Sequence, residues 1–133
     1  LEFRRVLFRS GLAALAASPA LPSLRPLTAL ELHGMVSGRS LKRDEVRIGG
    51  YGAESLCADG LWTQQIERVR SFGRWRVEEG RLCVEKRGEE TCREALVDEQ
   101  GGLWLAREGH PEDAQSYTIW PKTADLCTGI GAP

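Results

Sequence analysis

The chain has 133 residues, with 18 Lys and Arg residues against 19 Asp and Glu residues and a formal net charge of −1. Acidic and basic residues are interspersed, so the basic stripe typical of nucleic-acid-binding proteins is missing and no nucleic-acid partner is expected. The length corresponds to one domain, and a core this small benefits from the cross-links that its four cysteines can form.

The first ten residues resemble a sequencing adapter translated in one reading frame. We therefore expect residues 1–10 to be a sequencing or cloning artefact and exclude them from reasoning about the fold. The alternative is the basic first region of a signal peptide, which Arg4, Arg5 and Arg9 would suit.

An apolar run over residues 11–17 follows, and it ends in small residues at 18–20. This pattern is typical of a secretory signal peptide, so we interpret residues 11–20 as a signal remnant. Cleavage after Ala16 and cleavage after Ala20 both fit. The run is too short for a membrane-spanning helix, which needs about 20 apolar residues. The sequence therefore predicts a periplasmic or secreted protein without a transmembrane segment.

A short helix is predicted over about residues 29–37. Thr28 is placed to cap its first turn, and the Glu31 carboxylate is placed to accept a hydrogen bond from the Thr28 backbone amide, as in a capping box. Leu27 and Leu32 occupy the two positions of a hydrophobic staple. We expect this helix to lie across the end of a sheet.

Beyond the helix, turn signals recur about every ten residues, which indicates short antiparallel strands. The signals lie at residues 59–60, 79–80, 87–88 and 100–102. Residues 21–133 are therefore expected to form a single disulfide-stapled domain of the mainly β class. The predicted topology is an antiparallel meander that forms a small barrel or a sandwich, with one short N-terminal helix.

The hairpin around residues 87–88 predicts a disulfide. A loop centred there places Cys83 opposite Cys92 at a non-hydrogen-bonded pair, where the two Cα atoms lie about 4.5 Å apart. That distance is compatible with a disulfide. Cys57 and Cys127 then pair by elimination.

Alternation along the same hairpin leaves one residue out of place. Strict alternation puts Trp75, Leu82 and Val84 on one face, but it aligns Arg93 with them and sends Leu96 to the other face. We therefore predict a β-bulge near Arg93, which would shift the alternation by one residue and place apolar side chains on the inner face throughout the strand.

The four tryptophans lie on four predicted strands. Trp75 alternates with apolar neighbours and is expected in the core. A two-residue loop in the first hairpin would place Trp62 opposite Cys57, where it would cover a disulfide. Trp104 and Trp120 are left as candidates for a binding surface, because exposed aromatic patches mark partner or ligand sites.

Catalytic chemistry has little support in the sequence. A catalytic triad can be assembled from Ser116, His110 and Asp113. However, the spacing of these residues does not require a triad, and no nucleophile-elbow motif is present. The other histidine, His33, lies on the predicted helix. Without a C-x-x-C pair, the cysteines indicate disulfides rather than zinc. We therefore assign no catalytic residue, no metal ligand and no cofactor.

One segment carries a family resemblance. Gly73, Trp75 and Val77 precede a turn, which is followed by Leu82-Cys83 and then by Cys92. This pattern resembles small exported proteins, mostly proteobacterial, that are grouped as a domain of unknown function. The resemblance implies export and a compact β fold, and it implies no activity.

The sequence thus predicts an exported, non-catalytic binding or envelope-associated module. Its partner would be a protein or a small ligand of the cell envelope. The alternatives are a small secreted hydrolase that uses His110 and a lysozyme-inhibitor-like periplasmic protein. A cleft that holds His110 beside an acid and a hydroxyl would favour the hydrolase, whereas an exposed histidine would favour the binding module.

Overall fold

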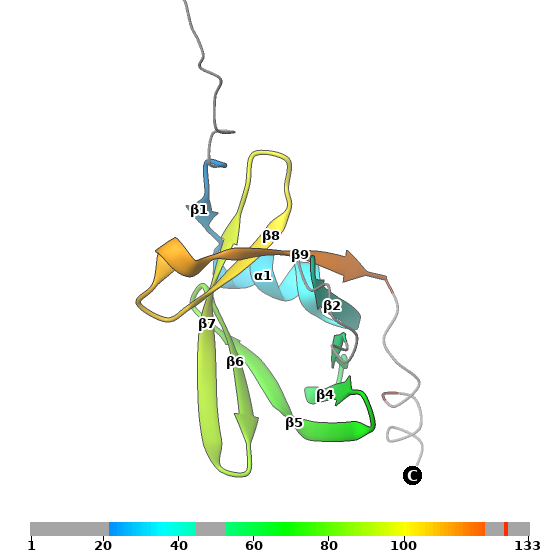
Figure 1. Cartoon of the computed structure of the whole chain (residues 1–133). Helices are drawn as coiled ribbons and strands as arrows, with labels where there is room; N and C mark the ends of the chain where they lie inside the picture. Colours follow the sequence, from blue (N-terminus) through cyan, green and yellow to red (C-terminus); the bar gives the residue numbers. More distant parts are fainter. Residues whose placement is uncertain (1–21, 45–52, 122–126, 128–133) are drawn as a thin grey trace, which may run out of the picture.

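The computed structural model describes residues 22–44, 53–121 and 127, and it contains a closed antiparallel barrel (Figure 1). Eight strands, β2 to β9, form the barrel, because the last strand pairs with the first. The elements are β1 (Arg25–Pro26), α1 (Ala29–Val36), β2 (Arg39–Arg43), β3 (Glu54–Leu56), β4 (Leu61–Ile66), β5 (Val69–Glu78), β6 (Arg81–Lys86), β7 (Glu89–Val97), β8 (Leu103–Arg107), the 3₁₀ turn η1 (Pro111–Asp113) and β9 (Gln115–Trp120).

The predicted fold class is confirmed, and of the two predicted architectures the barrel is present. Strands β2 to β9 follow one another around the barrel in chain order, so the topology is the expected meander. The short strand β1 pairs with the end of β7, beyond the point where β6 begins. The expected artefact and signal remnant, residues 1–20, lie outside the described residues.

Turn chemistry sets the register of the two central hairpins. Glu78 pairs with Arg81 and Lys86 pairs with Glu89, so both loops have two residues, as predicted. In the second loop Arg87 and Gly88 have φ angles of 54° and 83°. A type I′ turn requires positive φ at both central positions, and its twist matches that of the strands.

The helix α1 begins and ends within a residue of the prediction and has the predicted capping box. The Thr28 hydroxyl accepts a hydrogen bond from the Glu31 amide at 3.1 Å, and the Thr28 amide donates to the Glu31 carboxylate at 3.0 Å. Leu27 and Leu32 are both buried. The helix packs against β2, β5 and β6 and covers one end of the barrel, which we call the closed end.

The apolar core fills the barrel at this closed end. It includes Leu32 and Val36 from the helix, together with the inward side chains of the surrounding strands. Trp75 is among them, as predicted, and its indole donates a hydrogen bond to the Cys57 carbonyl at 2.8 Å. Gly73 also faces inward, where a Cβ atom would lie 2.4 Å from the Glu85 carbonyl oxygen. The glycine therefore lets β5 cross close to β6.

Both predicted disulfides are present. Cys83 and Cys92 are bonded across the β6–β7 hairpin with their Cα atoms 4.0 Å apart, and Cys57 is bonded to Cys127 with a Cα separation of 5.6 Å. The pairing of Cys83 with Cys92 follows from the two-residue loop at residues 87–88, as expected. Disulfides of this kind fit a protein of an oxidising compartment such as the periplasm or the extracellular space.

The predicted β-bulge near Arg93 is wrong. The β6–β7 ladder runs without interruption, with Leu82 opposite Arg93 and Arg81 opposite Glu94. Arg93 therefore faces the barrel interior, while Leu96 lies on the outer face and is buried beside β1. The inward arginine is tolerated because an acidic side chain meets it inside the barrel.

The first hairpin differs from the prediction by one residue. Leu56, not Cys57, is the partner of Trp62, and the Cys57 amide donates a hydrogen bond to the Leu61 carbonyl at 2.8 Å. The loop between β3 and β4 is therefore longer than the expected two residues. Because a shift of one residue exchanges the two faces of a strand, Trp62 points into the barrel and is buried.

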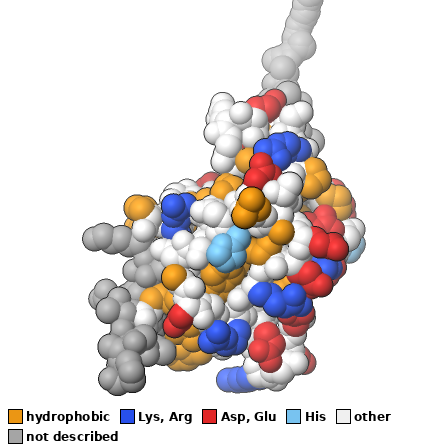
Figure 2. All heavy atoms as spheres, turned by 180° about the vertical axis from the view of Figure 1, so that it is seen from behind, with side chains coloured by type: hydrophobic (Ala, Val, Ile, Leu, Met, Phe, Trp, Pro, Cys, Tyr) orange, Lys and Arg blue, Asp and Glu red, His pale blue; other side chains and the backbone are white. Residues whose placement is uncertain are grey.

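The surface carries both signs of charge. Figure 2 shows acidic and basic side chains interspersed over one face, with smaller apolar areas between them. None of the helices in the described ranges has the length and apolar character needed to cross a membrane.

Candidate functional site

The barrel interior becomes polar at the end opposite the helix. This end, which we call the mouth, carries the β4–β5 turn at residues 67–68 and the β6–β7 turn at residues 87–88. Inward positions that are leucine or valine at the closed end are occupied here by Glu54 on β3, Lys86 on β6 and Arg93 on β7. The mouth is therefore the part of the interior that can recognise a polar ligand.

Glu54 and Arg93 form a two-pronged ion pair inside the barrel. Two guanidinium nitrogens of Arg93 each donate to one carboxylate oxygen of Glu54, both at 2.8 Å. The Trp62 indole donates a third hydrogen bond to Glu54 at 2.9 Å. The side chain of Glu54 is 4% exposed and that of Arg93 is 22% exposed, so the carboxylate is buried and the Arg93 side chain, which lines the cavity described below, is partly accessible.

The electrostatics of this pair keep Glu54 ionised. Burial alone would raise the pKa of Glu54, but the charge and hydrogen bonds of Arg93 outweigh it, with help from Trp62 and the charge of Lys86. The pKa of Glu54 is therefore lowered. Glu54 in turn raises the pKa of Arg93 against the effect of burial, and Tyr117 on β9 adds to this increase.

A cavity of about 200 Å³ lies above the ion pair. Trp62, Val84 and Thr91 contribute to its walls, and Lys86 extends over the Trp62 ring with its ammonium 5.2 Å from the ring centroid. A cation at this distance from an aromatic face is attracted by the ring. The complete lining is Glu54, Trp62, Gln64, Val84, Lys86, Thr91 and Arg93.

A second hollow leads outward from this cavity between two diverging hairpins. It has a volume of about 480 Å³ and shares Lys86 and Thr91 with the inner cavity. Strand β5 pairs with β4 from Val69 to Arg74, but with β6 only from Arg74 onward. Figure 1 shows the resulting divergence of the β4–β5 hairpin from the β6–β7 hairpin. We call the hollow between them the outer cleft.

The two tryptophans proposed from the sequence lie elsewhere, on the outer face of the barrel. Trp120 is 52% exposed, and Trp104 is partly buried with its indole bonded to Asp98 at 2.9 Å. Ser116 is the partner of Trp104, so Trp120 lies four residues farther along β9, about 13 Å away. They do not form one patch, and a binding role for either of them stays a prediction.

The residues of the hydrolase alternative are close in sequence but do not form a triad. The His110 side chain is 48% exposed and its Nδ1 lies 3.0 Å from a Glu112 carboxylate oxygen. Asp113 accepts hydrogen bonds from Arg107 instead. Within the described part of the chain, no side-chain hydrogen bond joins His110 to Ser116. The other histidine, His33, packs on the Trp75 ring, with 5.4 Å between ring centroids.

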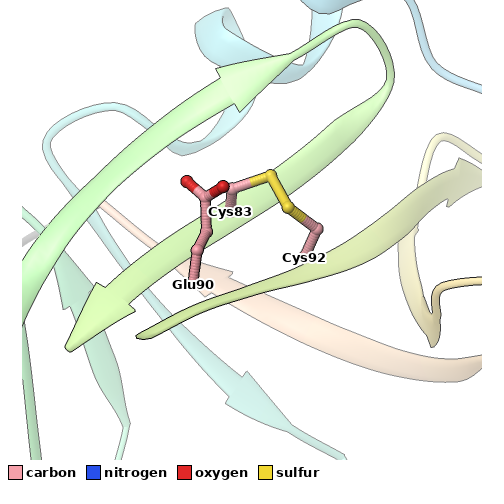
Figure 3. A group of neighbouring side chains, drawn as sticks. All are labelled: Cys83, Glu90 and Cys92. Atoms are coloured by element: carbon pink, nitrogen blue, oxygen red, sulfur yellow. A yellow bond between two sulfur atoms is a disulfide. The ribbon is translucent and has the colours of Figure 1, made fainter. Parts of the chain in front are cut away.

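Two groups of potential metal ligands occur among the described residues. In the first, Cys83, Cys92 and Glu90 are neighbours, but the two sulfur atoms are bonded to each other (Figure 3). A disulfide offers no thiolate to a metal. The second consists of the exposed residues His110, Glu112 and Asp113, whose carboxylates already bind His110 and Arg107.

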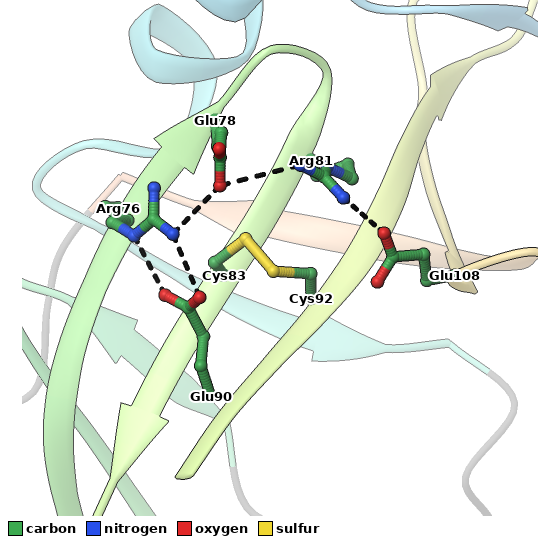
Figure 4. Close-up of a disulfide and its surroundings, with 7 residues drawn as sticks. All are labelled: Arg76, Glu78, Arg81, Cys83, Glu90, Cys92 and Glu108. Carbon is green, nitrogen blue, oxygen red and sulfur yellow. Dashed lines mark hydrogen bonds and ion pairs between the residues drawn. A yellow bond between two sulfur atoms is a disulfide. The ribbon is translucent and has the colours of Figure 1, made fainter. Parts of the chain in front are cut away.

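The disulfide between Cys83 and Cys92 lies in a network of surface ion pairs (Figure 4). Arg76 binds Glu90 through two hydrogen bonds of 2.8 and 2.9 Å. The network consists of Arg76, Glu78, Arg81, Glu90 and Glu108. These side chains face outward, on the other side of β6 and β7 from the cavity.

Sequence reasoning missed the residues that define the mouth. One signal was present, namely the charged Arg93 at an inward position of an otherwise apolar strand face. Glu54 gave no comparable signal, because its strand has only three residues and its partner lies 39 positions away.

No family model, curated protein or solved structure matches this chain.

Proposed function

We propose that this protein is an exported, non-catalytic binding module that receives a small ligand in the mouth of its barrel. The observation that carries the proposal is the Glu54–Arg93 pair, which lies beneath a cavity of about 200 Å³. Burying two charges costs free energy that apolar side chains of similar size would not cost. A binding site gives a reason to keep these charges, because convergent polar groups in a concave site orient a ligand.

Export is supported by two features of the chain. Both disulfides fit an oxidising compartment, and residues 11–17 have the composition of a signal-peptide apolar region. The hydrolase alternative lacks comparable support, since His110 is exposed and paired with Glu112.

A fragment screen tests the proposal. Uniformly ¹⁵N-labelled protein with both disulfides intact is mixed with pools of small neutral, anionic and cationic molecules, and ¹H–¹⁵N spectra are recorded. We expect the Trp62 indole resonance and the amides of Lys86 and Thr91 to shift together. Shifts confined to Trp104 or Trp120 would contradict the proposal and favour the outer aromatic residues.

A further inference from the structure

The charges around the cavity are unequal. The linings of the inner cavity and the outer cleft include four basic residues, whereas the whole chain carries a net charge of −1. Only two acidic residues, Glu54 and Glu89, line the same surfaces. The basic residues are Arg70, Lys86, Arg87 and Arg93.

The acidic residue inside the cavity is already neutralised. Both carboxylate oxygens of Glu54 accept hydrogen bonds from Arg93, and one of them also accepts from Trp62. Glu54 therefore has little capacity left to bind a cationic ligand. It serves instead to hold the guanidinium of Arg93 and the indole of Trp62 in position.

Lys86 provides a positive charge beyond the one that Glu54 and Arg93 neutralise in each other, although it also contributes to the lowered pKa of Glu54. Its ammonium lies over the Trp62 ring, and no carboxylate of the described residues lies within ion-pair distance of it. Because Lys86 borders both the inner cavity and the outer cleft, an anion that enters through the cleft meets this ammonium before it reaches Arg93.

The walls also offer apolar surface. Trp62 and Val84 line the inner cavity, and Phe72, which is 46% exposed, lines the outer cleft. At about 30 Å³ for each water molecule, the inner cavity holds the equivalent of roughly six to seven waters. It therefore fits the end of a small molecule, whose remaining part would lie in the cleft.

We propose that the mouth binds small carboxylic acids that have an apolar body, with the carboxylate held by Lys86 and Arg93, which both line the inner cavity. This inference rests on the proposed function, because it names the ligand class of the same site. The carboxylate replaces water around the two cations, and the apolar body contacts Trp62 and Phe72. Charge-assisted hydrogen bonds of this kind are about twice as strong as neutral ones.

The test compares 3-phenylpropanoate with its neutral isostere 3-phenylpropanamide and with inorganic phosphate. Binding is followed through the Trp62 indole resonance of the disulfide-bonded protein. We expect the acid to bind about tenfold or more tightly than the amide, which is the effect of one charge-assisted hydrogen bond. Equal binding of acid and amide would overturn the inference but leave the proposed function standing. Phosphate binding as tight as that of the acid would overturn the requirement for an apolar body.

The variant Lys86→Met isolates the charge, since methionine keeps an unbranched side chain beside Trp62. We expect it to weaken binding of 3-phenylpropanoate about tenfold or more. Lys42→Met is the matched control, because Lys42 is exposed on β2 and lines neither hollow. A dispersed ¹H–¹⁵N spectrum establishes that each variant is folded. Unchanged affinity in a folded Lys86→Met protein would overturn the role of Lys86.

Discussion

The two ends of the barrel are built from different chemistry. At the closed end, α1 inserts Leu32 and Val36 among apolar strand residues, and all of these side chains are buried. At the mouth, the same strands place a carboxylate and two cations inside the barrel. Burying apolar side chains stabilises the fold directly. Burying charges costs desolvation free energy, which their mutual attraction and hydrogen bonds must first offset. We therefore expect the closed end to maintain the fold and the mouth to keep groups that the fold does not need.

The molecule contains a second ion pair that makes this difference measurable. Arg76 and Glu90 have the same two-pronged geometry as Arg93 and Glu54, but they lie on the outer surface with side chains 51% and 37% exposed. An exposed pair contributes about 0–1 kcal/mol to stability. A buried pair behaves differently because each charge depends on the other.

The largest effect is expected when the buried pair is broken from one side. Arg93→Met leaves the Glu54 carboxylate buried with the Trp62 indole as its one remaining side-chain donor among the described residues. We expect the free energy of unfolding to fall by about 3–5 kcal/mol, as measured by urea denaturation, because an uncompensated charge remains inside the barrel.

The double variant Glu54→Gln/Arg93→Met removes both charges of the pair and is compared with Arg93→Met. Its neutral amide can still accept the Trp62 hydrogen bond, so we expect most of the lost stability to return while ligand binding at the mouth does not. The surface variant Glu90→Gln/Arg76→Met is the matched control, with an expected loss of about 1 kcal/mol or less. If the double variant at the mouth were as unstable as Arg93→Met, the pair would be required for the fold, and the contrast between the two ends would fail.

At the closed end, Leu32→Ala is expected to lower the free energy of unfolding by about 2–5 kcal/mol, because it removes a fully buried side chain and leaves a cavity. Thermal or urea denaturation measures the loss. Leu30→Ala on the same helix is the control, since Leu30 is 85% exposed and should change stability by less than about 0.5 kcal/mol. Ligand binding at the mouth should be unaffected in both proteins. A loss of binding in folded Leu32→Ala would show that the two ends are coupled.

The features predicted correctly from the sequence are governed by local chemistry. The capping box of α1 involves residues three positions apart, and the two-residue loop at 87–88 fixes the register that joins Cys83 to Cys92. In each case a few neighbouring side chains and the handedness of the backbone decide the structure.

The site could not be predicted in the same way because it depends on closure of the barrel. Glu54 and Arg93 are 39 positions apart, and only the closed sheet brings β3 and β7 to face each other across the interior. The expected bulge assumed that an inward arginine had to be removed from the core. Its acidic partner makes that removal unnecessary. Trp62 was misplaced for a simpler reason, because a longer loop before β4 reverses the faces of that strand.

The smallest expected effect concerns acid pH, and it follows from the lowered pKa of Glu54. A carboxylate with a depressed pKa stabilises the folded state above its unfolded pKa, which is ordinarily 4.5, and loses that contribution as the pH falls through its folded pKa. The stability of the natural sequence should therefore decline below about pH 4.5. Other carboxylates with lowered pKa values, such as Glu31 and Glu90, add to this decline.

The contribution of Glu54 to the pH dependence of stability is the difference between the unsubstituted protein and a variant that lacks this carboxylate. Urea denaturation of the natural sequence and of Glu54→Gln/Arg93→Met at pH 6, 4 and 3 should show a steeper loss for the natural sequence, because it alone has the Glu54 carboxylate, which adds its own proton uptake on unfolding to that of the carboxylates common to both proteins. Glu90→Gln/Arg76→Met removes an exposed carboxylate and should leave a slope closer to that of the natural sequence. Parallel curves for the natural sequence and the mouth variant would mean that Glu54 has the same pKa in both states. The ion pair would then give Glu54 no net electrostatic stabilisation in the folded state, and the distinction between the two ends of the barrel would lose its electrostatic basis.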